Sequence, residues 1–71
     1  MSEVGRKIQK LREEKEMSIQ ELALKVRVGK KTIEDYEKGI LIPNVQTLMK
    51  ISTALDVPAT ELADSRYHKT T

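Results

Sequence analysis

Residues 18–39 constrain the fold more than any other stretch of this 71-residue chain. Ser18 and Glu21 form a Ser-x-x-Glu capping box, in which each side chain accepts a hydrogen bond from the other residue's backbone amide at the start of a helix. Apolar residues then recur every three or four positions until Val28-Gly29 interrupts them, and a second periodic stretch continues to Gly39. The pattern predicts two short helices joined by a tight corner, which is a helix-turn-helix.

Apolar periodicity predicts three further helices outside this segment. One is expected over about residues 3–15, and a second over about 45–55 after the N-cap Asn44. A short last helix is expected to follow Pro58 and to contain Leu62.

The five predicted helices form one domain, expected over residues 1–64, because a chain of this length has no room for a second core. In the helix at about 45–55, Met49 and Ala54 are expected to widen the buried side. Residues 65–71 lack periodicity and are expected to form a flexible tail. No stretch has the alternation of a strand, so the predicted fold is compact and all-α.

Three helix ends fall on residues other than glycine, although a left-handed residue usually closes a helix. These residues are Glu16, Arg27 and Asp56, whereas Gly39 occupies such a position without strain. At Arg27 the left-handed backbone is expected to cost about 1 kcal/mol.

The composition limits the chemistry of the chain. Cysteine is absent, which excludes a disulfide framework and a thiolate metal site. No apolar run approaches the roughly 18 residues of a membrane span, and the N-terminus lacks the apolar segment of a signal peptide, so we expect a cytoplasmic chain. Ser18 has no histidine partner, His68 stands alone, and no carboxylates form a paired set. We therefore expect no enzyme activity and no cofactor or metal.

The charge distribution is asymmetric, although the net charge is only +2. Residues 1–31 contain nine basic and five acidic residues, whereas residues 32–71 contain four basic and six acidic residues. A phosphate-binding face produces such asymmetry, but a solvated helix surface rich in lysine and glutamate also produces part of it. Charge alone leaves both interpretations open.

In combination, these residues resemble the Cro and phage-repressor type (XRE-like) helix-turn-helix DNA-binding domains, over about residues 4–63. The resemblance implies a compact five-helix, lambda-repressor-like domain with its helix-turn-helix at about 18–38. The segment IEDYEKGILIPNVQTLMKI, with VGRKIQ upstream, is also similar, though more weakly, to the helix-turn-helix domain of multiprotein bridging factors, which are transcriptional coactivators. The residues that carry the main resemblance are Leu11-Arg12, residues 18–23, residues 26–28, Ile33, residues 36–39 and Pro43.

The resemblance implies that the helix at about 30–37 enters the DNA major groove with its first residues at the base edges. A lysine there can donate to guanine O6 and N7, and Asp35 can accept from a cytosine amino group. The starts of the helices after Ser18 and Asn44 are expected to abut phosphates. The candidate DNA-binding residues are Ile19, Gln20, Gly29, Lys30, Lys31, Thr32, Glu34, Asp35, Lys38 and Asn44, with Arg6 and Lys10 as candidates for more distant phosphate contacts.

An alternative stays open for the charged residues of this helix. Lys30 and Lys31 are ordinary solvated residues if the helix does not face DNA. Glu34 and Asp35 repel phosphates, but they can instead pair with Lys30, Lys31 and Lys38 at helical spacing.

The resemblance also implies a structural ion pair between Arg12 and Glu37, which would join the first helix to the end of the third. The chain departs from the family pattern at three places. Ile19 stands where a phosphate-binding glutamine is common, Arg27 stands where glycine is usual, and residues 40–42 are apolar where relatives often carry basic residues. This apolar loop is expected either to pack under the helix at about 45–55 or to meet a partner.

Two functional hypotheses follow. The first is a sequence-specific DNA-binding transcriptional regulator, a repressor that binds a palindromic operator as a homodimer. The second is a protein-interaction adaptor, coactivator or antitoxin-like module with weak DNA binding, which would use Ile40, Leu41 and Ile42 to bind its partner.

Overall fold

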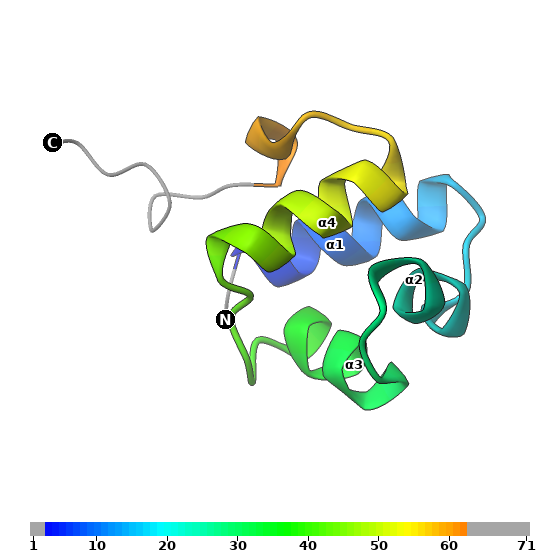
Figure 1. Cartoon of the computed structure of the whole chain (residues 1–71), viewed down its shortest axis with the longest axis vertical. Coiled ribbons are helices and arrows are strands. Elements are labelled where there is room, and N and C mark those ends of the chain that lie inside the picture. Colours follow the sequence, from blue (N-terminus) through cyan, green and yellow to red (C-terminus); the bar gives the residue numbers. More distant parts are fainter. Residues whose placement is uncertain (1–2, 63–71) are drawn as a thin grey trace, which may run out of the picture.

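The computed structural model describes residues 3–62, which form an all-helical bundle (Figure 1). The predicted helix-turn-helix is confirmed, with α2 and α3 meeting at the corner. The tail expected over residues 65–71 lies outside the described residues. The helices are α1 (Glu3–Glu14), α2 (Ile19–Val26), α3 (Lys30–Lys38), α4 (Val45–Leu55) and the short 3₁₀ helix η1 (Ala59–Glu61).

The expected count of five helices is not confirmed, because the described chain has four α-helices and the short helix expected after Pro58 is a 3₁₀ turn. After Pro58 the described chain completes a single 3₁₀ turn, in which the amide of Glu61 donates to the carbonyl of Pro58 at 2.9 Å. The amide of Leu62 donates to the carbonyl of Ala59 at 3.0 Å. These i to i+3 bonds define a 3₁₀ turn and not an α-helix. Leu62 follows η1 and its side chain is fully buried, so this turn anchors the end of the described chain.

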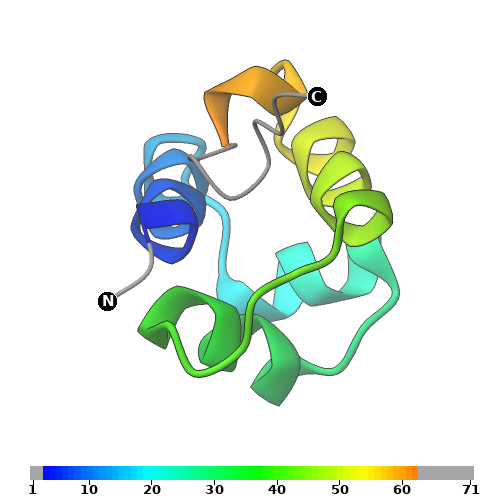
Figure 2. The same cartoon turned by 90° about the vertical axis from the view of Figure 1, so that its left-hand side faces the viewer.

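The core lies between the helices. Figure 2 shows α1 and α4 on opposite sides of the bundle, and both views place η1 and α3 at opposite ends. Tyr36 is 8% exposed and belongs to the core, as its spacing indicates. No helix within residues 3–62 combines the length and the apolar character needed to cross a membrane. The buried apolar residues are Val4, Ile8, Leu22, Ala23, Val26, Ile33, Tyr36, Leu48, Ile51, Leu55 and Leu62.

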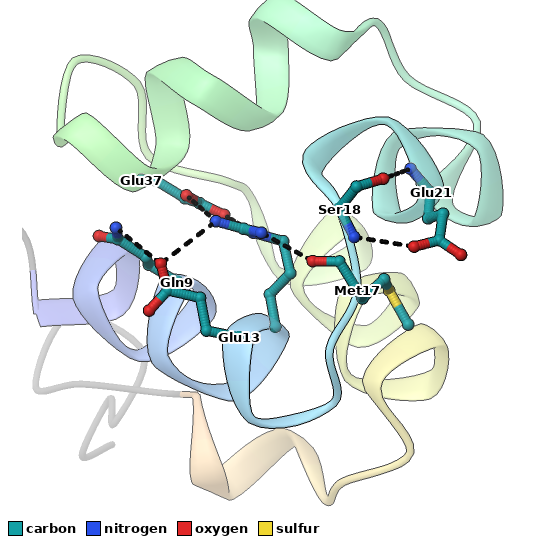
Figure 3. A network of polar contacts seen from close by, with 7 residues as sticks. Gln9, Glu13, Met17, Ser18, Glu21 and Glu37 are labelled. Carbon is teal, nitrogen blue, oxygen red and sulfur yellow. Dashed lines mark hydrogen bonds and ion pairs between the residues drawn. The ribbon is translucent and has the colours of Figure 1, made fainter.

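Local capping signals fix the starts of α2 and α4. The capping box of α2 is confirmed, because the Ser18 amide donates to Glu21 Oε1 at 2.8 Å and the Glu21 amide donates to Ser18 Oγ at 3.0 Å (Figure 3). Asn44 caps α4 by accepting a 2.8 Å bond from the Thr47 amide at its Oδ1. Each cap satisfies an amide that a helix start leaves without a partner.

The three helix ends with residues other than glycine are left-handed as expected. Their φ angles are 55° at Glu16, 67° at Arg27 and 60° at Asp56. At the corner, the amide of Arg27 donates to the carbonyl of Ala23 at 2.8 Å, so this residue closes α2 where a glycine would close it without steric cost.

Gly5 marks a close helix crossing that the sequence analysis did not anticipate. Gly5 is buried in α1, where a Cβ atom would collide with the carbonyl oxygen of Tyr36 and approach that of Glu37 within 3.1 Å. Only a glycine lets the backbone of α1 pass this close to the end of α3.

Arg12 and Glu37 form the predicted ion pair. Arg12 Nε donates to Glu37 Oε2 at 2.7 Å and Nη2 donates to Oε1 at 3.2 Å (Figure 3). The remaining nitrogen, Nη1, donates to the Met17 carbonyl at 2.7 Å. The hydrogen bond to Glu37 raises the pKa of Arg12 above its ordinary value, so the guanidinium stays charged throughout the pH range in which the protein is handled. One side chain therefore joins α1, the loop after it and α3.

Replacing Glu37 by alanine is expected to destabilise the fold by about 3 kcal/mol, because Arg12 would stay charged in a site that leaves 10% of its side chain exposed. The free energy of unfolding from denaturant titration measures this loss. Glu13→Ala is the matched control, since Glu13 is 59% exposed and lies 3.7 Å from the same guanidinium. Equal stability of the Glu37→Ala variant and the unmodified chain would contradict a structural role for the pair.

Replacing Arg27 by glycine is expected to raise the free energy of unfolding by up to about 1 kcal/mol, because the left-handed backbone at φ 67° no longer carries a Cβ. The Arg27 side chain forms no ion pair with another described residue, so the substitution removes no such interaction. Lys25→Gly, inside α2, is expected to lower stability by a similar amount. A lower thermal midpoint for Arg27→Gly would contradict this account of the corner.

Candidate nucleic-acid interface

The helix expected at about 30–37 is α3, which occupies the end of the bundle away from η1 (Figures 1 and 2). Ile33 and Tyr36 turn into the core and hold the helix in place. The opposite side of α3 has no other described helix over it in either view, so a long ligand can approach it.

The first turn of α3 is electropositive. It contains Lys30 and Lys31, both exposed, and no acidic residue. Gly29, the N-cap, has no side chain that could bond the first amides of the helix. The amides of Thr32 and Ile33 donate to the Gly29 carbonyl at 3.0 and 3.3 Å, but no side chain caps the helix start. The helix dipole and the two ammonium groups therefore both favour an anion at this end.

One acidic residue of α3, Asp35, forms an ion pair within the helix, whereas Glu34 does not. Lys31 Nζ lies 3.4 Å from Asp35 Oδ1, which confirms the pairing at helical spacing for this residue. The Asp35 side chain is only 14% exposed, whereas that of Lys31 is 82% exposed. An exposed i,i+4 pair is worth about 0.3–0.5 kcal/mol, so Lys31 can leave it for a stronger partner. Glu34 is half-buried and forms no ion pair with any residue in 3–62.

A shallow hollow brings the start of α2 together with the outer part of α3. It joins three of the candidate residues, Ile19, Glu34 and Lys38. Ile19 is half-buried and packs against the core, so its side chain offers no polar contact and only the backbone at the start of α2 can face a phosphate. Gln20, the next residue, is exposed. The residues that line the hollow are Gln9, Arg12, Ile19, Glu34, Glu37 and Lys38.

Other candidates lie apart from the first turn of α3. Asn44 is exposed, and because Oδ1 caps α4, its amide nitrogen is the atom left for a ligand. No described contact joins Asn44 to Lys30 or Lys31. Lys10 lines a hollow with Glu61 of η1, which lies at the far end of the bundle, so Lys10 does not belong with the α3 surface.

The connector between α3 and α4 remains on the surface and does not pack under α4. Ile40, Leu41 and Ile42 are 65%, 44% and 42% exposed, and Val45 beside them is 56% exposed. The amides of Ile40 and Leu41 donate to the carbonyl of Asp35 at 2.9 and 3.2 Å, which holds the loop against the end of α3. We call these four apolar residues the connector patch.

Met49 corrects a second expectation. Its side chain is 55% exposed and lies on the solvent side of α4, although helical spacing indicated that it would widen the buried side. Leu48 and Ile51, its neighbours on the buried stripe, fill the core without it. Leu24 of α2 is also exposed, at 70%, and lies off the apolar stripe of that helix.

Comparisons with known proteins all identify helix-turn-helix proteins. A helix-turn-helix family model matches residues 8–62. The multiprotein-bridging factor 1 of Candida albicans is 48% identical over 54 residues, which is 76% of this chain and 36% of that protein. The transcriptional regulator SinR of Bacillus subtilis is 35% identical over 65 residues, which is 90% of this chain and 59% of SinR. This chain thus spans about a third of the length of the bridging factor.

Three solved structures share the fold. The restriction-modification controller protein C.AhdI from Aeromonas hydrophila superposes with a TM-score of 0.83 at 26% identity, covering 86% of this chain and 92% of that one. SinR in complex with DNA superposes with a TM-score of 0.80 at 37% identity, covering 86% of this chain and 98% of that one. SinR has also been solved in complex with the SinI protein, with a TM-score of 0.79.

Three structural features agree with the family match. They are the capping box, the left-handed corner and the Arg12–Glu37 pair. This chain belongs to the XRE-type helix-turn-helix family and is similar, within it, to the multiprotein bridging factors.

Proposed function

We propose that this chain is a sequence-specific DNA-binding module that regulates transcription, with the outer side of α3 in the major groove. The observation that carries the proposal is the exposed first turn of α3, which combines two lysines, a helix start without a side-chain cap and no acidic residue. DNA presents phosphates and guanine acceptors that match these donors. The similar protein SinR has been solved in complex with DNA, which supports the same use of the fold here.

The proposed contacts divide between bases and phosphates. Lys30 and Lys31 reach guanine O6 and N7 or the flanking phosphates, and Thr32 lies on the same turn. Asp35, once Lys31 turns to DNA, can accept from a cytosine amino group, although its 14% exposure limits its reach. The backbone at the start of α2 and the exposed Gln20 are placed for phosphate contacts that fix the register on the duplex.

One α3 helix can contact only a few base pairs. We therefore propose that two copies bind DNA together as a homodimer. Their α3 helices would enter successive major grooves on one face of the DNA, roughly 34 Å apart, and the operator would be palindromic. A dimer that covers a promoter in this way acts as a repressor by excluding other proteins. The expected site of action is the cytoplasm.

The second candidate function is that of an adaptor, coactivator or antitoxin-like module, and the connector patch favours it. Ile40, at 65% exposure, lies where related domains often carry basic residues that grip the DNA backbone. An apolar loop adds nothing to phosphate binding but suits a protein surface. Under this hypothesis DNA binding is weak, and a heteromeric complex depends on Ile40, Leu41 and Ile42.

Selection of bound sequences from random duplex DNA is expected to enrich one palindromic motif with the unmodified chain. Lys30→Ala/Lys31→Ala is expected to lose this enrichment, because each base contact contributes about 1–3 kcal/mol of discrimination. The matched control is Lys10→Ala/Lys15→Ala, which removes the same charge from α1 and the loop after it and is expected to enrich the same motif.

Absence of an enriched motif with the unmodified chain would contradict the first function. Weak, unselective DNA binding, together with a stable protein complex that Ile40→Lys/Ile42→Lys disrupts, would favour the second function.

A further inference from the structure

A groove between α2 and α4 is separate from every residue proposed for DNA. It is open to solvent along its length, has a volume of about 520 Å³, and is lined by residues of both helices. Lys25 comes from α2, and the others come from the middle and last turns of α4. The lining residues are Lys25, Met49, Lys50, Thr53 and Ala54.

The two lysines of the groove have no counter-charge within residues 3–62. Neither Lys25 nor Lys50 forms an ion pair or a side-chain hydrogen bond there. Glu21, one turn before Lys25, accepts the Ser18 amide at its Oε1 at 2.8 Å and forms no ion pair with Lys25. The Thr53 hydroxyl donates to the Met49 carbonyl at 3.0 Å. The groove therefore presents two uncompensated cations and no competing carboxylate in its lining.

The remaining surface of the groove is apolar and adaptable. Met49 is 55% exposed and Ala54 is half-buried beside it. Methionine has an unbranched, polarisable side chain that adjusts to different partners, and lysine stems cover apolar surface while their ammonium groups stay in water. Exposed methionine between lysines suits a ligand that is apolar on one stripe and acidic at its edges.

We propose that this groove binds an acidic amphipathic helix of a partner protein. A helix laid against two packed helices completes a three-helix arrangement, with its apolar stripe on Met49 and Ala54 and its carboxylates beside Lys25 and Lys50. A basic segment would meet like charges, and a neutral one would leave both lysines uncompensated. DNA phosphates would pair with the two ammonium groups, but the DNA backbone has no apolar surface to contact Met49. Binding here does not need the α3 surface, so this proposal and the DNA proposal can fail independently.

The test is a displayed library of helical peptides of about 16 residues, long enough to hold a helix on a protein surface. Leucine is fixed at i, i+3, i+4 and i+7, and the other positions vary among Glu, Lys, Gln and Ala. Peptides selected on the folded chain are expected to be acidic. Their affinity is expected to fall by about tenfold or more for Lys25→Glu/Lys50→Glu and less for Lys25→Ala/Lys50→Ala, with circular dichroism confirming that each variant folds.

Two controls make the result specific to the groove. Lys10→Glu/Lys15→Glu carries the same charge change away from the groove and is expected to bind the selected peptides unchanged. Peptides in which Glu is replaced by Lys are expected to recover binding to Lys25→Glu/Lys50→Glu. The proposal is overturned if no peptide is enriched or if the enriched peptides are neutral or basic. It is also overturned if the affinity of the peptides is unchanged by substitution of Lys25 and Lys50. It is also overturned if the groove substitutions abolish duplex DNA binding and leave peptide binding intact, since the groove would then be a nucleic-acid surface.

Discussion

The Arg12–Glu37 pair is the interaction on which the orientation of α3 depends. Three donors of one guanidinium bond Glu37 at 2.7 and 3.2 Å and the Met17 carbonyl at 2.7 Å, so α1, its following loop and α3 meet at one group. The Glu37 side chain is 7% exposed, which keeps water and salt from screening the contact. A buried pair of this kind specifies geometry more than it adds net stability. Its consequence is a fixed angle for the helix that presents Lys30 and Lys31.

The fold was largely predictable because its decisive signals are local. Ser18 and Asn44 mark helix starts through hydrogen bonds within three residues, and Gly39 marks a helix end through its own backbone. Gly5 was missed because its role arises only when α1 crosses α3, and no short pattern reports a crossing. Met49 was misplaced because helical spacing gives the direction of an apolar stripe but not its width.

The sequence alone identified the helix face that forms the candidate site. It did not identify the contacts of the individual side chains. Spacing put Lys31 and Asp35 one turn apart, and the structure pairs them at 3.4 Å. Ile19 illustrates the opposite case, because its partial burial depends on packing against other helices. Which side chain meets which base depends on how the domain docks, and docking geometry is not encoded in local periodicity. The connector patch is a second exposed surface, and the function proposed for it would depend on a protein partner.

The salt dependence of DNA affinity tests the central claim most directly, because phosphate contacts release counterions. If two copies bind together as proposed and each neutralises about four phosphates, we expect the logarithm of the association constant to fall with the logarithm of salt concentration at a slope of roughly −7. The measurement is an anisotropy titration of the selected duplex at several salt concentrations. A slope near zero would contradict the assignment of the α3 surface, with Lys30 and Lys31, to DNA.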